Sequence, residues 1–407
     1  MPDRTTASDG TAAPAGTTGL VYGMGLDALV EPDWPPLALG EAEIVLRGYP
    51  DLGGAEAVLW RSPRPLSSTA KVTTLGGQTV IVKRLHQSLR TPEALAEEHA
   101  FMDHLRSGGT ARIGPSPVPS VFRDEDGRSA VARGEFVYEV QQVGVGEDRY
   151  QGVFSWSPYL SLHQARAAGR ALAELHVAAV GHDAHRRDPG PLTSCFSIFA
   201  GDDPAQRMHE LAEKRPGLGI FLAERDWRAD IERVHRPAHE RLLPLLNGLE
   251  PLWTHNDWHG TNLLWQGDGP ESHVSAVFDF GLADRTIAVH DVAMAIERCA
   301  VDWISVRDGG PANVQYAQVE ALLDGYETVR ELAAPERRAL PELFPLVHAE
   351  YELSEIDYFM SCTPGATPDE NRRENAEIAY RDYFLGHTAW TEAAEGKSLL
   401  GLLRSRR

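Results

Sequence analysis

The chain has 407 residues, 42% of them hydrophobic and 24% charged, and its 59 acidic against 39 basic side chains give a formal charge of −20. This is the composition of a globular protein with two or three domain-sized parts. The charge argues against DNA or RNA as a partner, because phosphate backbones need a basic surface, and it leaves two readings, solubility alone or attraction of a cationic substrate. Three widely separated cysteines argue against a disulfide framework. The sequence has no apolar segment of the signal-peptide type and no run of about 18 apolar residues, so we expect a cytoplasmic protein that does not enter the membrane.

Strands dominate the first third of the chain. Residues 1–20 are mostly Thr, Ala, Gly, Ser and Pro, too poor in apolar side chains to pack a core, so we predict a disordered tail. After it, short apolar runs separated by turn signals predict strands, and a longer segment that ends in a Ser-Gly-Gly stop predicts a helix. The predicted strands are residues 56–60, 70–75, 79–83 and 135–140, and the predicted helix is 92–105. We therefore expect a small β-rich N-lobe over residues 21–142.

Helices dominate the rest of the chain. Ser161 and Gln164 have the spacing of a capping box, at the start of a helix with leucines and alanines along one face. Two short apolar runs, residues 263–265 and 274–280, interrupt the helical pattern and predict a hairpin. The expected fold class is therefore α+β, with a larger, mostly helical C-lobe over residues 143–407.

The most informative segment reads H-N-D-W-H-G-T-N at residues 255–262 and is followed by D-F-G at residues 279–281. Asp257 and Asp279 flank the predicted hairpin, and Asn262 follows the first of them closely. A carboxylate and an amide oxygen are hard ligands that suit Mg²⁺, which bridges substrate phosphates. A second carboxylate nearby can accept a proton from an attacking hydroxyl. This inventory favours phosphoryl transfer.

In this order and spacing, the two motifs resemble those of the aminoglycoside phosphotransferase and choline kinase branch of the protein-kinase-like superfamily. The resemblance implies a bilobal protein-kinase-like fold, with Asp257 as the catalytic base and with Asn262 and Asp279 as ligands of Mg²⁺. His255 would brace the catalytic loop. The family pattern has glycine where this chain has Asn256, a departure at a position that is not a ligand.

Flanking segments extend the resemblance over roughly residues 55–300. Asp291 matches a second acidic position of the family, which we interpret as a structural tie for the loop rather than a metal ligand. Residues 168–176 resemble the family helix that ends in L-x-x-L-H.

Lys83 is one of only four lysines in a chain whose other basic side chains are arginines. It ends a predicted apolar strand, where a compact ammonium group can bind the α- and β-phosphates of a nucleotide, although a strand-end lysine can also simply extend to solvent. Together with the downstream motifs we assign it to the nucleotide, and we expect a helix glutamate to pair with it. Glu98 is the first candidate because Leu105 stands seven residues later, as in family helices, and Glu97 is the second.

The remaining nucleotide contacts are weakly marked. Ser67 and Ser68 lie between the first two strands, where hydroxyl and backbone N–H groups could cradle phosphates as in the Ser-rich loops of antibiotic-modifying family members, although an ordinary polar turn fits equally well. Gln141 follows the strand before the connection between lobes, where backbone groups would contact the purine. The sequence does not decide between ATP and GTP.

Three further patterns are incomplete. His255 and His259 have the spacing of a zinc-binding helix, but the glutamate that H-E-x-x-H requires is Asn256 here. Residues 396–398 (Gly-Lys-Ser) and 144–146 (Gly-Val-Gly) resemble parts of nucleotide-binding loops, but each lacks the rest of its motif, and we interpret both as turns.

Residues 348–359 predict a helix that mixes aromatic and acidic side chains. Its acids are Glu350, Glu352, Glu355 and Asp357. At 3.6 residues per turn they fall on more than one face, so some are expected to be solvated. Aromatic and acidic groups on one helix would also suit an amino sugar or another cationic alcohol. Trp258, directly after the expected base, fits either a cleft wall or the core.

Together these features predict a Mg²⁺-dependent O-phosphotransferase that moves the γ-phosphoryl group of ATP or GTP to a hydroxyl of a small molecule. The expected acceptor is an aminoglycoside-like antibiotic, with choline, a sugar or an amino alcohol behind it, so antibiotic resistance and metabolism both stay open as roles. A protein Ser/Thr kinase of the same superfamily and a nucleotide-binding pseudokinase are the competing hypotheses. Pseudokinases usually lack the lysine, the base or a metal ligand, and here all are present. The predicted partners are the nucleotide and the acceptor, without nucleic acid or membrane.

Overall fold

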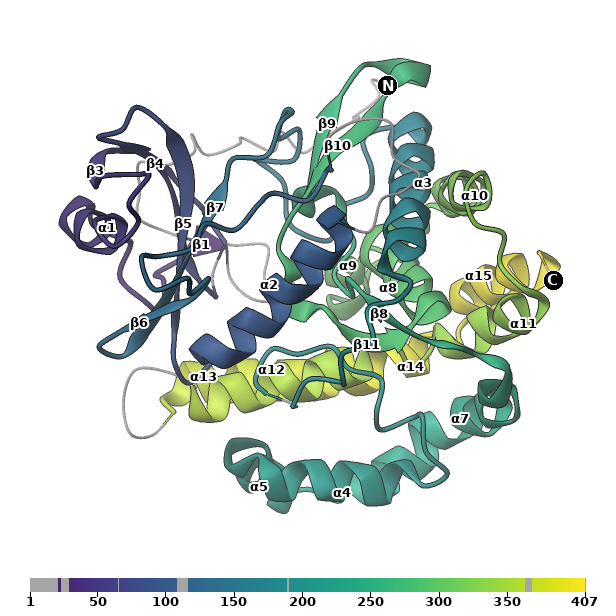
Figure 1. Cartoon of the computed structure of the whole chain (residues 1–407). Coiled ribbons are helices and arrows are strands. Elements are labelled where there is room, and N and C mark those ends of the chain that lie inside the picture. Colours follow the sequence, from purple (N-terminus) through teal and green to yellow (C-terminus); the bar gives the residue numbers. More distant parts are fainter. Residues whose placement is uncertain are drawn as a thin grey trace, which may run out of the picture.

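The computed structural model describes residues 21–22, 29–64, 66–107, 116–188, 190–362 and 368–406. The predicted tail over residues 1–20 lies outside the described residues. In the described part, an antiparallel sheet precedes a mostly helical remainder, so the predicted α+β class is confirmed (Figure 1). The boundary between lobes at residues 142 and 143 stays a prediction.

A five-stranded antiparallel sheet forms the first part of the fold, in the order β3-β4-β5-β7-β6. The strands are β3 (Ala55–Arg61), β4 (Ser68–Thr74), β5 (Thr79–His86), β6 (Val131–Arg133) and β7 (Phe136–Gln142). Four of them, β3, β4, β5 and β7, confirm the four predicted strands. Valines at alternate positions of β4, β5 and β7 supply one buried face, because side chains in a strand point to opposite faces in turn. A separate two-residue pairing joins β1 (Val21–Tyr22) to β2 (Leu29–Val30).

Two helices flank this sheet on opposite sides (Figure 1). Helix α1 (Leu39–Leu46) packs its Val45 and Leu46 against the valine face. Helix α2 (Pro92–Ser107) confirms the predicted helix and places Leu95 against Val137 of β7. Further along α2, Phe101, Met102 and Leu105 belong to the large core of the C-terminal part. Helix α2 therefore couples the sheet to the helical part.

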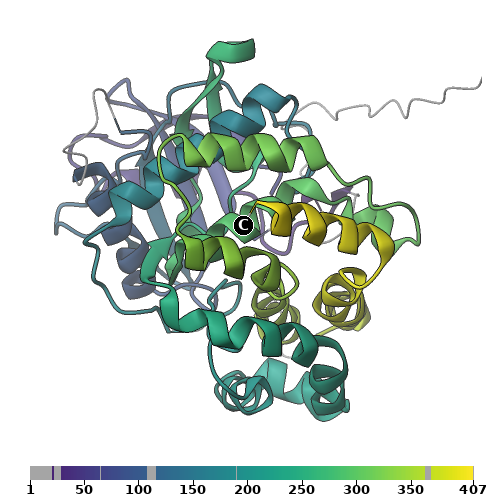
Figure 2. The same cartoon turned by 90° about the vertical axis from the view of Figure 1, so that its right-hand side faces the viewer.

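The C-terminal part is built mainly from helices and contains two small two-stranded sheets, one of which projects from the edge of the molecule (Figures 1 and 2). Its α-helices are α3 (Leu162–Ala179), α4 (Pro204–Lys214), α5 (Pro216–Ala223), α6 (Trp227–Asp230), α7 (Arg236–Leu242), α8 (Ala288–Ala300), α9 (Trp303–Arg307), α10 (Tyr316–Glu327), α11 (Ala334–Leu343), α12 (Ala349–Ser361), α13 (Glu370–Ile378), α14 (Gly386–Trp390) and α15 (Ala394–Ser405). Shorter 3₁₀ and π turns are η1 (Ile231–His235), η2 (Leu243–Gly248), η3 (Gly260–Asn262), η4 (Gly269–Glu271), η5 (Phe280–Leu282) and η6 (Ala379–Leu385). None of the described helices combines the length and apolar character needed to cross a membrane.

The predicted hairpin forms between β9 (Leu263–Gln266) and β10 (His273–Val277). Its second strand ends before Phe280, because that residue begins η5. A second antiparallel pair joins β8 (Pro251–Thr254) to β11 (Asp284–Ile287).

The predicted capping box at the start of α3 is only half formed. The Ser161 side chain accepts a hydrogen bond from the Gln164 backbone N–H at 3.2 Å, as predicted. The Gln164 side chain instead accepts from the hydroxyl of Tyr150. A tertiary partner has therefore displaced the reciprocal local bond, and sequence spacing alone cannot reveal this.

One of the two turn interpretations is wrong. Residues 396–398 lie inside α15, where a side chain at Gly396 would place its Cβ 2.3 Å from the carbonyl oxygen of Trp390. The glycine therefore permits the close approach of α15 to the end of α14. Residues 144–146 do follow β7 as a non-helical connection, and Gly146 has φ of 133° and packs against the β9–β10 hairpin.

Candidate active site

A cleft between the sheet and the helical part collects most of the predicted site residues. Lys83 of β5 lines it together with Asp257, Asn262 and Asp279. The strand pairing explains why the last three converge. Because β8 pairs with β11 and β9 pairs with β10, the loop from β8 to β9 and the loop from β10 to β11 lie side by side. The sequence-predicted motifs thus form one site.

Asp291 of α8 holds the start of the catalytic loop. Its carboxylate accepts hydrogen bonds from the backbone N–H groups of His255 and Asn256, both at 2.9 Å, and from His176 Nε2 at 3.0 Å. Although burial alone would raise the pKa of Asp291, the hydrogen bond and charge of His176 lower it. The interpretation of Asp291 as a structural tie is confirmed.

His255 links the catalytic loop to the segment that carries Asp279. Its Nδ1 accepts from the N–H of Asp257 at 3.2 Å, and its Nε2 donates to the carbonyl of Phe278 at 3.1 Å. Burial lowers the pKa of His255, which favours the neutral ring that these two bonds require. Trp258 is fully buried and packs edge-on against His255, so it belongs to the core and not to the cleft wall.

Asp257 is surrounded by groups that favour its ionised form. Its Oδ2 accepts from Asn262 Nδ2 at 3.0 Å, while its Oδ1 lies 3.4 Å from both His259 Nε2 and Arg298 Nε. Burial alone would raise the pKa of Asp257, but the charge and hydrogen bond of His259 and the charge of Arg298 outweigh it and hold the pKa well below its usual range. The Asp257 side chain is therefore a hydrogen-bond acceptor at physiological pH.

Sequence reasoning missed His259 and Arg298 as neighbours of Asp257. His259 was considered only as a zinc ligand with His255, but it precedes η3 in a loop and does not share a helix with His255. Arg298 lies two helical turns after Asp291, and this shared face of α8 is the one signal that could have pointed to it.

The amine of Lys83 pairs with Asp279. The Nζ and Oδ1 atoms are 2.8 Å apart. Burial alone would lower the pKa of Lys83, but the charges of Asp279 and Glu139 raise it, so the ammonium form is stabilised. Asp279 itself has φ of 58°, a left-handed conformation that turns its carboxylate toward β5 and leaves the side chain 44% exposed.

The predicted ion pair between Lys83 and Glu98 is wrong for the described residues. Glu98 lines the same cleft, but its Oε1 accepts from Arg90 Nε at 3.0 Å and from Arg187 Nη2 at 2.5 Å. Both arginines also donate to the carbonyl of Gly281, at 2.8 and 3.1 Å. Through Arg90, which lies shortly before α2, and Arg187, from a distant loop, Glu98 links α2 to the segment after Asp279.

Of the other residues predicted to contact the nucleotide, one lines the cleft and two are not among its described lining residues. Ser67 lines the cleft, with its hydroxyl 3.1 Å from that of Thr69. The hydroxyl of Ser68 donates instead to the carbonyl of Pro35 at 3.1 Å. Gln141 pairs through its backbone with Ile81 of β5. Ser68 and Gln141 are not among the described cleft-lining residues, and their assignment to the nucleotide stays a prediction.

The opposite end of the cleft is aromatic and acidic. Phe154, Trp156, Tyr351 and Glu355 line it. The guanidinium carbon of Arg298 lies 4.7 Å from the ring centres of both Trp156 and Tyr351, so a cation already packs on each of these rings.

The prediction that some acids of α12 are solvated is wrong. Glu350, Glu352, Glu355 and Asp357 are all buried. Glu350 accepts hydrogen bonds from the backbone N–H groups at 197 and 198, and Asp357 binds Arg215 at 2.9 Å. These two acids tie neighbouring segments to α12, whereas Glu355 reaches the cleft.

A model of the Phosphotransferase enzyme family (APH) matches residues 65–332, roughly two thirds of the chain. The chain belongs to this family. Its relationship to individual family members is more distant, as the comparisons with curated proteins and solved structures show.

Several curated proteins that are similar to this chain are named homoserine kinase. It is 26% identical to a homoserine kinase of Azorhizobium caulinodans over 272 residues, which cover 65% of this chain and 70% of that protein. It is 26% identical to a homoserine kinase of Hyphomonas neptunium over 204 residues, which cover 50% of this chain and 56% of that protein. The matched part thus spans little more than half of the second relative.

Among solved structures, this family member is similar to the spectinomycin phosphotransferase APH(9)-Ia in complex with ADP and spectinomycin. The TM-score is 0.50 at 9% identity, over 90% of this chain and 98% of the other. At that identity the likeness is one of fold, and the predicted kinase-like fold is confirmed.

The family's metal ligands can be tested against the residues present. Asn262 donates its Nδ2 to the carbonyl and to Oδ2 of Asp257, both at 3.0 Å, which leaves its amide oxygen as an acceptor at the cleft. Asp279 uses Oδ1 for Lys83 and is half exposed in the same cleft. An amide oxygen beside a carboxylate is a donor set that Mg²⁺ accepts, so these residues fit the ion.

Proposed function

We propose that this chain transfers the γ-phosphoryl group of ATP or GTP to the hydroxyl of a small alcohol that carries an amino group. The observation that carries the proposal is the meeting of Lys83, Asp257, Asn262 and Asp279 in one cleft. A cation, an ionised carboxylate and a carboxylate–amide pair are the groups that phosphoryl transfer requires. Membership of a phosphotransferase family supports the same reaction class.

In the proposed reaction the acceptor oxygen forms a bond to the γ-phosphorus, and the bond from that phosphorus to the β–γ bridging oxygen breaks. The hydroxyl proton passes to Asp257 and then to solvent, and the products are a phosphate monoester and a nucleoside diphosphate. Because its pKa is held low, Asp257 acts first by accepting the hydrogen bond of the hydroxyl and aligning its oxygen. It takes the proton late, as a loose transition state allows.

The nucleotide side uses the opposite wall of the cleft. Lys83 would bind phosphate oxygens as a point charge, with the Ser67 hydroxyl nearby. Asn262 and Asp279 would hold Mg²⁺, which when bound neutralises charge on the β- and γ-phosphate oxygens. Glu98 contributes by binding Arg90, which donates to the carbonyl of Gly281 and so helps to position the segment that carries Asp279.

An amino group on the acceptor is supported by the aromatic and acidic end of the cleft. A protonated amine is attracted by the faces of Trp156 and Tyr351 and by the Glu355 carboxyl group. The curated relatives named homoserine kinase suggest homoserine, an amino alcohol, as the first acceptor to test. The fold neighbour that binds spectinomycin makes aminoglycoside-like antibiotics the second.

The test is a transfer screen on the full chain. ATP and GTP are offered, with Mg²⁺ and with EDTA, against homoserine, choline, spectinomycin, aminoglycosides and simple sugars, and products are identified by mass spectrometry. We expect one phosphate to be gained by an amine-bearing alcohol in the presence of Mg²⁺. Nucleotide binding without any phosphorylated product would contradict the proposal and favour the pseudokinase hypothesis.

Asp257→Asn tests the assigned base. The substitution keeps the shape of the side chain and removes its charge, so transfer should fall by about a thousandfold while nucleotide affinity changes little. Asp268→Asn is the matched control, because the Asp268 side chain is 95% exposed. Transfer by Asp257→Asn at a rate close to wild type would show that another group accepts the proton.

A further inference from the structure

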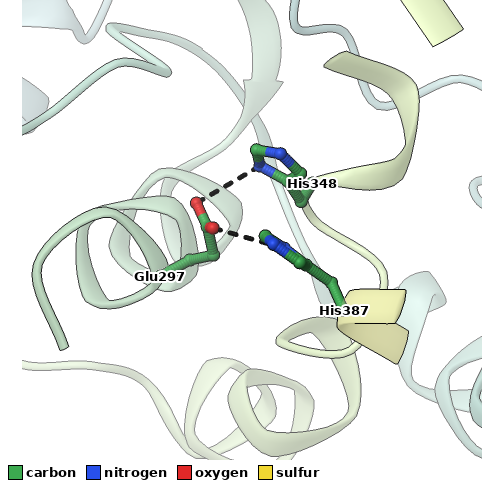
Figure 3. Close-up of side chains that lie close together, drawn as sticks. All are labelled: Glu297, His348 and His387. Atoms are coloured by element: carbon green, nitrogen blue, oxygen red, sulfur yellow. Dashed lines mark ion pairs between the residues drawn. The ribbon is translucent and has the colours of Figure 1, made fainter. Parts of the chain in front are cut away.

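Behind the cleft, three helical segments bring together two histidines and a glutamate (Figure 3). Glu297 belongs to α8, His348 directly precedes α12 and His387 lies in α14. The three side chains are 1%, 2% and 5% exposed. His348 Nδ1 lies 3.4 Å from Oε2 of Glu297, and His387 Nδ1 lies 3.4 Å from Oε1.

The polar atoms of this cluster lack hydrogen-bond partners. Within the described part of the chain, none is found for either carboxylate oxygen of Glu297, for Nδ1 of His348 or for either ring nitrogen of His387. The 3.4 Å separations are longer than N–H···O bonds, which cluster between about 2.7 and 3.2 Å. Burying a carboxyl group this deeply without hydrogen-bond partners destabilises a fold unless another group, such as a metal ion, binds it. Arg298 lies close by, with its Nε 3.8 Å from Oε2 of Glu297. The same Nε lies nearer to Asp257, at 3.4 Å from Oδ1.

A metal ion would satisfy these atoms together. Two imidazole nitrogens and a carboxylate form a ligand set of zinc sites and of related first-row metals. Ligand atoms about 2.1 Å from a tetrahedral ion lie roughly 3.4 Å from each other, and each histidine Nδ1 lies at that distance from one of the two Glu297 oxygens. All three ligand atoms fall within 4.8 Å of one another.

The surroundings of the two rings also resemble a metal site. Nε2 of His348 contacts a carboxylate oxygen of Glu352, and metal-bound histidines almost always engage their other nitrogen in this way. In the tautomer that carries its proton on Nε2 and donates it to Glu352, the lone pair of His348 is on Nδ1, the atom that faces Glu297. The ring of His387 is stacked on Trp303, with centroids 3.5 Å apart, which restrains its orientation.

We propose that Glu297, His348 and His387 bind a divalent first-row transition metal, with Zn²⁺ as the first candidate. Such an ion would join α8, α12 and α14 at one point and would be distinct from the Mg²⁺ expected at Asn262 and Asp279. It would also restrain Arg298, which follows Glu297 directly in α8 and lies beside Asp257. The metal would therefore stabilise the fold and position Arg298 under the catalytic carboxylate.

Metal content of the untagged full chain tests the proposal first. The protein is purified without chelator, and zinc and other metals are measured by mass spectrometry after exhaustive dialysis. We expect about one metal ion per chain, and Co²⁺ added to stripped protein should give the visible absorption bands of a four-coordinate site. Wild-type protein that holds no metal and gives no Co²⁺ bands would overturn the proposal, because this result does not depend on any variant.

Variants then locate the site. Glu297→Gln keeps volume and removes one anionic ligand, so Zn²⁺ affinity should fall by more than a hundredfold, and the Tm increase on adding Zn²⁺ should disappear. Glu352→Gln replaces the carboxyl group beside His348 Nε2 with a neutral amide and should weaken binding by tenfold to a hundredfold. His209→Gln, at an exposed position of α4, is the control and should change neither. Equal Zn²⁺ affinity in wild type and Glu297→Gln would place the metal elsewhere and overturn the assignment.

Discussion

Asn256 adopts a left-handed backbone conformation, with φ of 59°. This conformation costs most residues about 1–2 kcal/mol, and asparagine is among the few that tolerate it apart from glycine. The side chain adds hydrogen bonds, among them one from Nδ2 to the carbonyl of Leu282 at 3.2 Å and one from the Thr254 hydroxyl to Oδ1 at 2.9 Å. The departure from the family glycine therefore keeps the backbone shape and gains a link between the catalytic loop and the β11 side.

Two substitutions at this position separate conformation from hydrogen bonding. Asn256→Gly loses the side-chain bonds but keeps the backbone conformation, whereas Asn256→Ala loses both. We expect the free energy of unfolding, measured with urea, to be about 1 kcal/mol lower for the alanine variant than for the glycine variant. Equal stability of the two variants would show that the left-handed backbone contributes nothing.

At the scale of elements, α3 and α10 approach closely enough for each to need a glycine. A Cβ on Gly169 of α3 would lie 1.9 Å from the carbonyl oxygen of Leu322, and one on Gly325 of α10 would lie 1.9 Å from that of Arg166. The pair matters for the site, because α3 also carries His176, which binds Asp291.

Gly325→Ala should therefore force the two helices apart. We expect a loss of about 3 kcal/mol or more in the free energy of unfolding, at the upper end for an overpacked core. Gly401→Ala is the matched control, a helical glycine of α15 with nothing within 4 Å of the added Cβ, where the better helix propensity of alanine should stabilise slightly. Denaturant unfolding of both variants checks the prediction, and a similar small effect at both positions would contradict the close contact.

For the whole molecule, buried acids make stability depend on pH. Burial raises the pKa of Glu355 to about 7, although Arg298 acts in the opposite direction. Burial and the neighbouring Glu355 raise the pKa of Glu352 as well. Between the unfolded value of 4.5 and about 7, the folded chain thus holds a proton that the unfolded chain has released. The contribution of Glu355 to the free energy of unfolding therefore falls as pH rises through this range.

Glu355→Gln tests this dependence. Glutamine cannot release a proton, so the decrease in stability between about pH 5 and 7, which one group limits to about 1.4 kcal/mol per pH unit, should become shallower. The control is Glu271→Gln at an exposed position, where the slope should stay that of the wild type. Urea unfolding across the pH range provides the measurement, and parallel profiles for wild type and Glu355→Gln would contradict the raised pKa.

The sequence also predicted the elements that depend on local pattern. Strands β3, β4, β5 and β7, helix α2 and the β9–β10 hairpin follow from apolar periodicity and turn residues. Asp257, Asn262 and Asp279 were found from two linear motifs. They form a cluster because β9 pairs with β10 and β8 pairs with β11, which brings the loops that carry the motifs together.

The wrong predictions concern charged side chains whose partners come from other segments of the chain. Glu98 was expected to bind Lys83, but Arg90 and Arg187, from loops far apart in the chain, occupy it. The acids of α12 were expected to include solvated ones, but all four are buried, Asp357 against α5 and Glu350 against the segment near residue 197. The charged residues of a helix do not reveal which other segments will pack over them.

By itself, the sequence determined the fold class, the family and the motifs that carry the proposed site of this protein. These depend on patterns of residues close together in the chain, which can be read without the structure. Only the tertiary structure decided that Lys83 pairs with Asp279, that Arg298 lies beside Asp257, and that Glu297, His348 and His387 meet in the core. The physical reason is that ion pairs and ligand clusters depend on distances between side chains a few ångströms apart, and packing of whole helices sets those distances.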